Sequence, residues 1–242
     1  RLSIAVPKLQ IEGIMGVIET LKNKVVVSCQ AMPNEPLYRE ECMLAMMKSV
    51  LNGGAGGLRV AGARDVMNAK KITNVPVIGL TKPDEIPANW KEIVYITPSL
   101  KHVGFLIKAG ADVIAFDGTS RKHENCTLDE IIKLISINKR ISMADISTVE
   151  EGINCEKLGV DMVSTTLAGY TQFSPLKGDG PDFELLEELV KSVKIPVVLE
   201  GRIWEPEQID KAFKIGAHCV VIGSAITRPQ LITKRFVQRK EK

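Results

Sequence analysis

The chain has 242 residues, of which 45% are hydrophobic and 25% are charged, and its formal net charge is +3. This composition fits an ordinary soluble globular protein, and the length suits one large domain. A net charge this small gives no reason to expect a nucleic-acid or membrane partner, although a local basic site for a phosphate group remains compatible with it.

The N-terminal segment and the cysteines indicate the compartment. Residues 1–10 include Pro7 and Lys8 and lack the apolar core of a secretory signal. No stretch approaches the ~20 apolar residues of a membrane span. The five cysteines are scattered, without C-x-x-C spacing. Free thiols in a reducing cytosol are therefore expected, which predicts a cytoplasmic protein.

The first predicted element is an amphipathic helix over residues 11–21, ahead of the first strand. Further helices are predicted over residues 37–51, 63–72, 99–109, 128–136, 148–158, 183–193, 205–214 and 229–237. The segment from Ser147 to Glu151 offers a capping box, and Pro206 lies just inside the start of its helix.

Short apolar runs separate these helices, and most of them lead into a polar or charged residue. The runs cover residues 25–27, 57–58, 77–80, 113–116, 141–144, 162–163, 197–199 and 220–222. A fully buried parallel strand reads as such a run, and strands that alternate with helices form a parallel sheet. Roughly eight strand–helix units are what a (β/α)8 TIM barrel needs. An open doubly wound sheet would carry a G-x-G-x-x-G turn after its first strand, but residues 29–33 contain no glycine.

We therefore predict an α/β protein, a (β/α)8 TIM barrel with an extra N-terminal helix. Residues 1–242 are expected to form a single domain, because no linker or low-complexity stretch interrupts them. Within it, residues 1–23 form an N-terminal extension and residues 238–242 a frayed tail.

TIM barrels place their chemistry at the carboxyl ends of the strands. Gln30, Lys82, Asp145 and Glu200 follow the first, third, fifth and seventh strands, so we expect them to face one another around the mouth. Arg59 comes from the second strand. Arg59 and partial desolvation would lower the pKa of Lys82 and make it a base, whereas the carboxylates would keep it protonated. The sequence leaves that balance open.

Glu200 is either an acid or base toward a substrate oxygen or a plain ion-pair partner of Lys82. The loops after the last two strands are typical of a phosphate site, with glycines for close backbone approach, a hydroxyl and positive charge. These residues are Gly201, Arg202, Gly223, Ser224 and Arg228. His123 is expected on a solvated loop. No metal or other cofactor is expected, since no H-E-x-x-H, cysteine cluster or P-loop is present.

Taken in order, seven segments resemble the N-acetylmannosamine-6-phosphate 2-epimerase family. They are residues 27–31, 53–59, 76–82, 143–147, 165–171, 200–203 and 223–229. The resemblance extends from about the first strand to Val237 and implies a TIM barrel that acts on a phosphorylated amino sugar. It implies interconversion of N-acetylmannosamine 6-phosphate and N-acetylglucosamine 6-phosphate in bacterial sialic-acid catabolism, without a redox cofactor.

The resemblance also implies a role for each matching side chain. Lys82 would move the proton at C2 of the sugar, and Glu200 would assist with the sugar oxygens and ring opening. Gln30, Arg59 and Asp145 would hold the substrate. Removal of the C2 proton, beside the carbonyl of the open-chain sugar, gives an enolate that Arg59 could stabilise.

The chain departs from the family pattern directly after Lys82. The family usually has arginine, aspartate and tyrosine there, whereas this chain has Pro83, Asp84 and Glu85 and then a longer loop through Trp90. How that loop helps to bind substrate is left open.

Two alternatives to the epimerase are left by the sequence. One is another phosphosugar barrel enzyme, such as a lyase with a Schiff base on Lys82 or an isomerase. The other is a non-catalytic phosphosugar-binding barrel. The sequence does not give the oligomeric state, for which a homodimer is one candidate.

Overall fold

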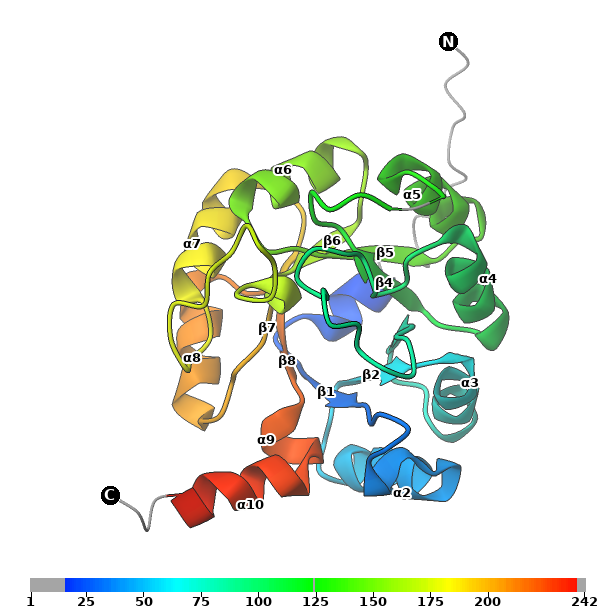
Figure 1. Cartoon of the computed structure of the whole chain (residues 1–242), viewed down its shortest axis with the longest axis vertical. Helices are drawn as coiled ribbons and strands as arrows, with labels where there is room; N and C mark the ends of the chain where they lie inside the picture. Colours follow the sequence, from blue (N-terminus) through cyan, green and yellow to red (C-terminus); the bar gives the residue numbers. More distant parts are fainter. Residues whose placement is uncertain (1–15, 124, 239–242) are drawn as a thin grey trace.

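The computed structural model describes residues 16–123 and 125–238. Eight parallel strands form a closed barrel in chain order, with helices around it (Figure 1). They are β1 (Val25–Cys29), β2 (Gly57–Ala61), β3 (Val77–Leu80), β4 (Val113–Asp117), β5 (Ile141–Asp145), β6 (Met162–Ser164), β7 (Val197–Glu200) and β8 (Cys219–Ile222). The predicted (β/α)8 TIM barrel is confirmed.

The helices follow the strands as the hydrophobic periodicity predicted, except for the short helix α9, which was not among the predicted helices. They are α2 (Glu40–Asn52), α3 (Ala63–Ile72), α4 (Leu100–Ala109), α5 (Leu128–Ile137), α6 (Val149–Lys157), α7 (Phe183–Ser192), α8 (Pro206–Ile215), α9 (Ser224–Thr227) and α10 (Pro229–Val237). The predicted start at residue 37 is wrong for α2, because Arg39 has an extended ψ of 146° and separates it from a short 3-10 turn, η1 (Pro36–Tyr38). The predicted capping box forms between Thr148 and Glu151.

Side chains along each strand alternate between the barrel interior and the layer under the helices. Val26 and Met143 belong to the interior cluster, whereas Val27 and Ala144 pack in the outer one. Because successive side chains of a strand point to opposite faces, the same alternation turns Ser28 and Asp145 inward. The strand order therefore delivers polar side chains to one enclosed place above the apolar interior.

A helical segment over residues 16–21 closes the amino-terminal end of the barrel. Leu21 is fully buried in the interior cluster, and Val17 and Ile18 pack against that cluster. The Nε2 atom of His218 lies 2.7 Å from the carbonyl oxygen of Ile18. The predicted N-terminal helix thus plugs the barrel from below over its described part, whereas residues 11–15 of that prediction lie outside the described residues.

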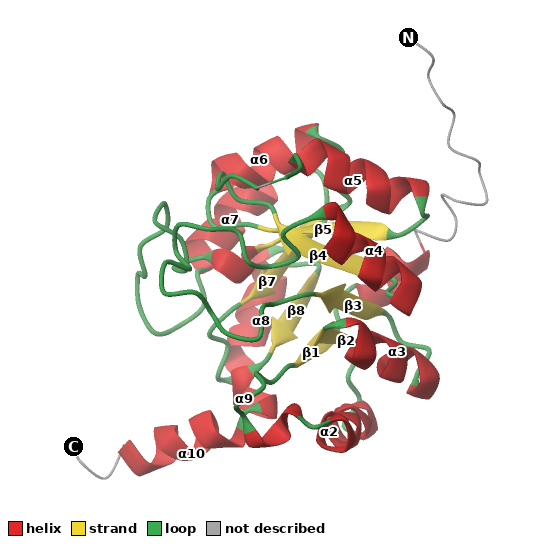
Figure 2. Cartoon of the chain, turned by 45° about the vertical axis from the view of Figure 1, so that its right-hand side comes forward, coloured by secondary structure: helices red, strands yellow, loops and turns green. Residues whose placement is uncertain are grey.

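Helix α10 extends away from the barrel at its C-terminal half (Figures 1 and 2). None of its residues is buried, and Phe236 is 73% exposed. It packs mainly on α9, which in turn packs on β1, and the side chains of Gln230 and Arg235 reach Glu35 and Glu205. The chain therefore presents an amphipathic helix with part of its apolar surface uncovered. Of the predicted tail over residues 238–242, only Gln238 lies within the described residues. A single domain over residues 1–242 stays a prediction.

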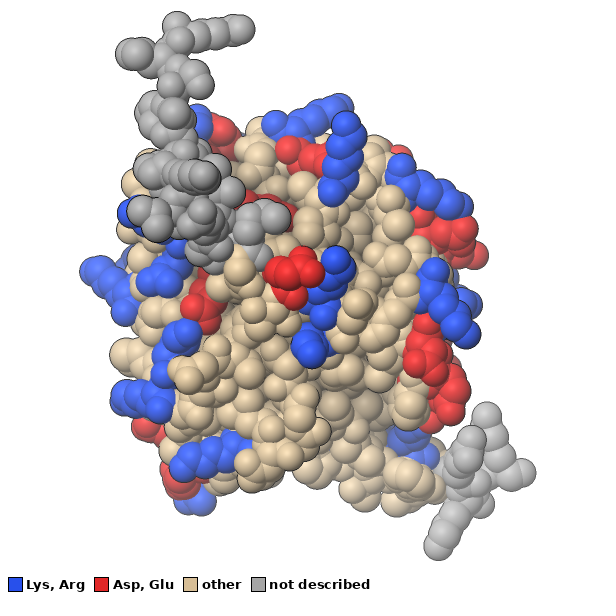
Figure 3. Space-filling model, turned by 180° about the vertical axis from the view of Figure 1, so that it is seen from behind, with Lys and Arg blue, Asp and Glu red and all other residues tan. Residues whose placement is uncertain are grey.

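The opposite face, at the amino ends of the strands, carries charges of both signs. Figure 3 shows basic and acidic side chains interspersed on the part of this face that grey atoms leave uncovered. Among the described residues, no helix is long and apolar enough to cross a membrane.

Candidate active site

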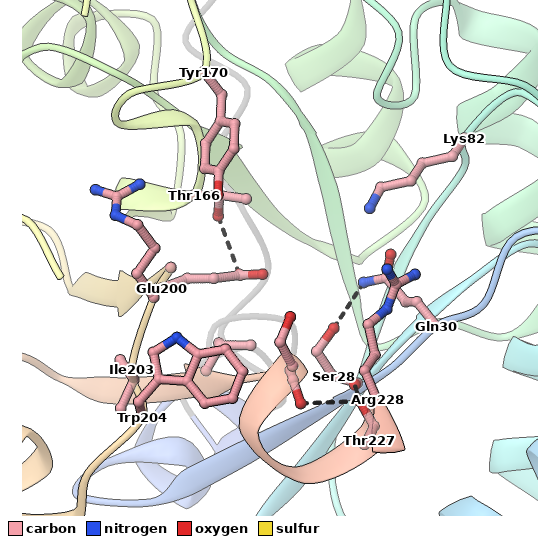
Figure 4. Close-up of a pocket in the computed structure, with 15 residues that line it drawn as sticks. Ser28, Gln30, Lys82, Thr166, Tyr170, Glu200, Ile203, Trp204, Thr227 and Arg228 are labelled. Atoms are coloured by element: carbon pink, nitrogen blue, oxygen red, sulfur yellow. Dashed lines mark hydrogen bonds between the residues drawn. The ribbon is translucent and has the colours of Figure 1, made fainter. Parts of the chain in front are cut away.

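A pocket of about 440 Å³ opens at the carboxyl ends of the strands (Figure 4). This size suits a small-molecule ligand. The predicted site residues that line it are Gln30, Lys82, Glu200, Gly201, Arg202, Gly223, Ser224 and Arg228. Ser28, Thr166, Tyr170 and Trp204 also line it and were not among the predicted site residues. The structure therefore brings residues from both ends of the chain into one cavity.

Arg59 and Asp145 lie beneath the pocket. Their side chains are 1% and 0% exposed. The guanidinium of Arg59 binds Asp145 with both terminal nitrogens, Nη1 at 3.1 Å from Oδ1 and Nη2 at 2.6 Å from Oδ2. Nη1 also lies 3.1 Å from Oε2 of Glu200. In this structure the pair reaches the pocket through Glu200, so direct binding of substrate by Arg59 and Asp145 stays a prediction.

Lys82 points into the pocket from the loop after β3 (Figure 4). Its side chain is exposed toward the open pocket, and the protein atoms of the barrel mouth partly desolvate its ammonium group. This desolvation, and then the positive charge of Arg59, lower the pKa of Lys82 from 10.5 to about 8, against the opposing charge of Glu200. The balance that the sequence left open thus falls toward a lysine that is partly deprotonated near neutral pH, as a general base requires.

Glu200 closes β7 and has a side chain that is 14% exposed. Burial raises the pKa of Glu200; the charge of Arg59 opposes this effect and that of Asp145 adds to it. The backbone of Glu200 is held by Thr165, whose Oγ1 donates to its carbonyl oxygen at 3.0 Å and accepts from its N–H at 3.1 Å. A carboxyl group fixed in this way can give a proton to a substrate oxygen and take it back.

The predicted phosphate side of the pocket is formed by Gly201, Gly223, Ser224 and Arg228. Gly201 has a φ of +114°, a conformation that glycine adopts without the steric cost of a side chain. Gly223 caps α9, and the first N–H groups of a helix have no partner within it. The guanidinium of Arg228 enters the pocket (Figure 4), where Nη2 donates to Oε2 of Glu35 at 2.8 Å.

Arg202 is held by the loop that follows β6. Its Nε donates to the carbonyl oxygen of Gly180 and its Nη1 to that of Ala168, both at 2.8 Å. These bonds fix a residue whose φ of 56° is uncommon for a side chain other than glycine. Two of its guanidinium nitrogens thus serve the loop, while Arg202 still lines the pocket together with Arg228. Binding of phosphate by Arg202 stays a prediction.

Gln30 presents an acceptor to the pocket. Its Nε2 donates to Oγ of Ser28 at 2.8 Å. Its Oε1 is buried and has no hydrogen-bond partner within the described part of the chain. An unpaired buried acceptor costs free energy, so a ligand N–H or O–H that reached it would be favoured.

The loop that departs from the family pattern is tied to its neighbours. Nη1 of Arg121 donates to the carbonyl oxygen of Trp90 at 2.9 Å, and the Trp90 ring lies 6.0 Å from that of Tyr170. Arg121 is itself anchored by a buried ion pair with Asp117 of 2.5 Å. The loop therefore packs against Tyr170, which lines the pocket, and carries Lys82 at its start.

The expectation that His123 lies on a solvated loop is wrong. The residue is 6% exposed, and its two ring nitrogens each lie 3.1 Å from a backbone carbonyl oxygen, of Pro98 and of Asp117. Its ring thus fills the gap between two loops. Among residues 16–123 and 125–238, no three His, Cys, Asp or Glu side chains are grouped so that they could hold a metal ion.

Comparison with known proteins places the chain among carbohydrate epimerases. Residues 43–242 match the family described as "Putative N-acetylmannosamine-6-phosphate epimerase". Relatives named "Putative N-acetylmannosamine-6-phosphate 2-epimerase" include one from Clostridium perfringens strain ATCC 13124, 46% identical over 90% of this chain and 97% of its own length. Another, from Clostridioides difficile strain 630, is 44% identical over 93% of this chain and 99% of its own length.

Solved structures give the same relationship. The N-acetylmannosamine-6-phosphate 2-epimerase from Clostridium perfringens superposes with a TM-score of 0.86 at 45% identity, covering 92% of this chain and 95% of that one. A thiamine phosphate pyrophosphorylase from Pyrococcus furiosus, at 18% identity and a TM-score of 0.60 over 93% of this chain and 96% of that one, shares the fold alone.

Proposed function

Because the chain belongs to the N-acetylmannosamine-6-phosphate epimerase family, we propose that it interconverts N-acetylmannosamine 6-phosphate and N-acetylglucosamine 6-phosphate. The observation that carries the proposal is one pocket in which a lysine with a pKa lowered to about 8 faces a carboxyl group whose pKa burial raises. The two sugars differ only in configuration at C2. Their interconversion therefore requires a base and an acid, and no net oxidation.

The reaction follows from these two groups. Glu200 first assists ring opening by moving a proton between the sugar oxygens, which exposes the C1 carbonyl. Neutral Lys82 then removes the proton from C2, and the electron pair of that C–H bond moves toward the carbonyl oxygen. Glu200 donates a proton to this oxygen, so no full negative charge accumulates. A proton from solvent then enters the opposite face of C2, Lys82 releases its extra proton to solvent, and the oxygen proton returns to Glu200, which gives the other epimer and restores both groups.

Arg59 lies beneath the pocket and acts on both Lys82 and Glu200. Its charge lowers the pKa of Lys82 and holds the carboxyl group of Glu200 at 3.1 Å. Asp145 fixes the guanidinium in turn through two hydrogen bonds. The buried pair thus orients the acid and makes the base available at the same time.

The 6-phosphate is assigned to the loops after β7 and β8. Gly201, Gly223 and Ser224 offer close backbone approach and a hydroxyl, and Arg228 supplies the charge. Gln30 faces the same volume with a free acceptor, which suits a hydroxyl or the N–H of the acetamido group. Binding at both ends fixes C2 between Lys82 and Glu200.

The direct test of the function is whether the purified protein converts the proposed substrate. Incubation with N-acetylmannosamine 6-phosphate is expected to give N-acetylglucosamine 6-phosphate, followed by the anomeric proton signals in NMR, and the reverse reaction should reach the same ratio. N-acetylmannosamine without phosphate serves as the control and should react far more slowly, because it lacks the group that Arg228 and the glycine loops would bind. A protein that binds the phosphorylated sugar without converting it would refute the enzyme and support a binding protein.

The setting of the reaction is part of the proposal. A step between these two sugars fits bacterial sialic-acid catabolism. The five cysteines are free thiols, which suits a reducing cytoplasm. A homodimer is supported by the uncovered apolar surface of α10, which a second copy could cover. Light scattering would then give twice the mass of one chain, whereas a monomer mass at micromolar concentration would count against the dimer.

A further inference from the structure

Thr166 occupies a position that the sequence did not single out. It lies on η2 (Thr165–Leu167), the 3-10 turn that follows β6. Its Oγ1 is 2.8 Å from Oδ1 of Asp145 and 3.0 Å from Oε2 of Glu200. The Oγ atom of Ser164 is a third neighbour at 2.8 Å. One hydroxyl therefore stands between the buried ion pair and the acid of the pocket. Figure 4 shows its contact with Glu200.

A count of protons shows which state this arrangement fits. The hydroxyl of Thr166 has one hydrogen to donate and two lone pairs that accept. If Asp145 and Glu200 were both ionised, that hydrogen could serve only one of them. The other contact would then join a lone pair to a carboxylate oxygen. Both contacts become hydrogen bonds only when one of the two carboxyl groups carries a proton.

Asp145 is the group held as the anion. It is bound at both oxygens by the guanidinium of Arg59, as a bidentate ion pair. Thr166 then donates to Oδ1 of Asp145, which is the nearer carboxyl oxygen at 2.8 Å, against 3.0 Å to Glu200. Its lone pairs are left to accept from Ser164 and from a protonated Oε2 of Glu200. In this state Oε2 of Glu200 donates to Thr166 and accepts from Nη1 of Arg59, which lies 3.1 Å away.

We propose that Thr166 is a positioning residue that keeps the carboxyl group of Glu200 protonated and directed at the pocket. This rests on the proposed function only in that Glu200 is the acid of the reaction. A single hydrogen bond from Thr166 to an ionised Glu200 would have the opposite effect, and so the two arrangements predict opposite results when the hydroxyl is removed.

Other charges around Glu200 must be considered in a titration. The groups that face it are Arg59 from β2, Lys82 after β3, Asp145 from β5, Tyr170 after β6, Cys219 from β8 and Arg228 after α9. Substitution of Thr166 alters none of these charges. A shift in the titration of Glu200 would therefore report on the hydroxyl.

The test follows the protonation of Glu200 directly, in the whole chain and without substrate. Glutamate labelled with ¹³C at the carboxyl carbon is incorporated, and the Glu200 signal is identified as the one lost in Glu200→Gln. In the unsubstituted chain its titration midpoint should lie above the ordinary 4.5. Thr166→Val should lower that midpoint by roughly one pH unit, the scale of one hydrogen bond to a charged group, and Thr166→Ser should restore it.

Thr165→Val is the matched control, because the hydroxyl of Thr165 binds the backbone of Glu200 and not its carboxyl group. It should lower the thermal midpoint and leave the titration midpoint in place. An unchanged or raised midpoint in Thr166→Val, or a serine variant that behaves like valine, would overturn the proposal. A midpoint at or below 4.5 in the unsubstituted chain would overturn it even if Thr166→Val failed to fold. Since no substrate is present, absence of epimerase activity would leave this result untouched.

Discussion

Lys82 shows how one residue acquires its chemistry from its place in the fold. It is the second residue after β3, so the alternation along the strand turns it inward, and the barrel mouth surrounds it. Desolvation and Arg59 then lower its pKa to about 8. The direction of the side chain was predictable from the sequence. The balance of charges around it was not, because it depends on distances across the barrel.

The pH dependence of the reaction follows from this pKa. A base must be neutral to act, and below pH 8 the fraction of neutral Lys82 falls tenfold for each pH unit. Because Glu200 must be protonated while Lys82 is neutral, we expect a bell-shaped profile of kcat/KM in which the titration of Lys82 gives a break at about pH 8. The measurement is initial rates from pH 5.5 to 9.5 at low substrate concentration.

Two variants complete this prediction. Lys82→Met should lower kcat by at least about a thousandfold, the upper part of the range for loss of general-base catalysis. Lys101→Met, which replaces an exposed lysine on α4, is the control and should leave the rate and the profile unchanged. A profile that is flat through pH 8, or an active Lys82→Met, would remove Lys82 from the role of base.

Arg59 and Asp145 show where prediction at the residue scale ended. Their inward direction follows from the alternation, and the predicted convergence with Glu200 is found. Their depth does not follow from the sequence. Arg59 lies two residues before the end of β2, whereas Lys82 lies two residues beyond the end of β3. The stagger of the strands in the barrel sets these heights, and no local pattern encodes it.

At the scale of elements, the helices were predictable to within one residue where capping and periodicity agreed, as for α3 and α10. Helix α2 was the exception, since the break at Arg39 lies in the backbone conformation of that residue and not in the hydrophobic pattern of the helix. The departure of α10 from the barrel was also beyond prediction. An amphipathic pattern shows that a face is to be covered, but not what covers it.

Glu151 joins three elements and should contribute strongly to stability. It is 3% exposed, and its two carboxyl oxygens accept from the N–H groups of Ser120, Ser147 and Thr148. Glu151→Ala leaves these donors, of which that of Ser147 is buried, without their partner and should lower the free energy of unfolding by about 3 kcal/mol. For a chain of this size that is a fall in Tm of roughly 6 to 12 °C.

The neighbouring exposed residue gives the control for this prediction. Glu150→Ala removes the same carboxyl group one position earlier, where it is exposed, and should change Tm by no more than about 2 °C. Thermal unfolding followed by circular dichroism compares the two. Equal effects of both substitutions would show that the contacts of Glu151 contribute little.

At the scale of the whole molecule, closure of the barrel is what makes a site from scattered residues. Ser28 near the start of the chain and Arg228 near its end line one pocket because β1 pairs with β8. Thr227 reinforces this closure, since its Oγ1 donates to the carbonyl oxygen of Ser28 at 2.7 Å. The eight-strand count indicated the closed sheet, and closure in turn explains why residues far apart in sequence meet.

The central claim is that this pocket exchanges the proton at C2 of a phosphorylated amino sugar. The measurement is NMR of N-acetylmannosamine 6-phosphate incubated with the protein in deuterated water. The C2 proton signal should be lost from the sugar as N-acetylglucosamine 6-phosphate forms, and Lys82→Met should abolish both changes. Formation of the product with its C2 proton retained, or neither product nor exchange, would contradict the account.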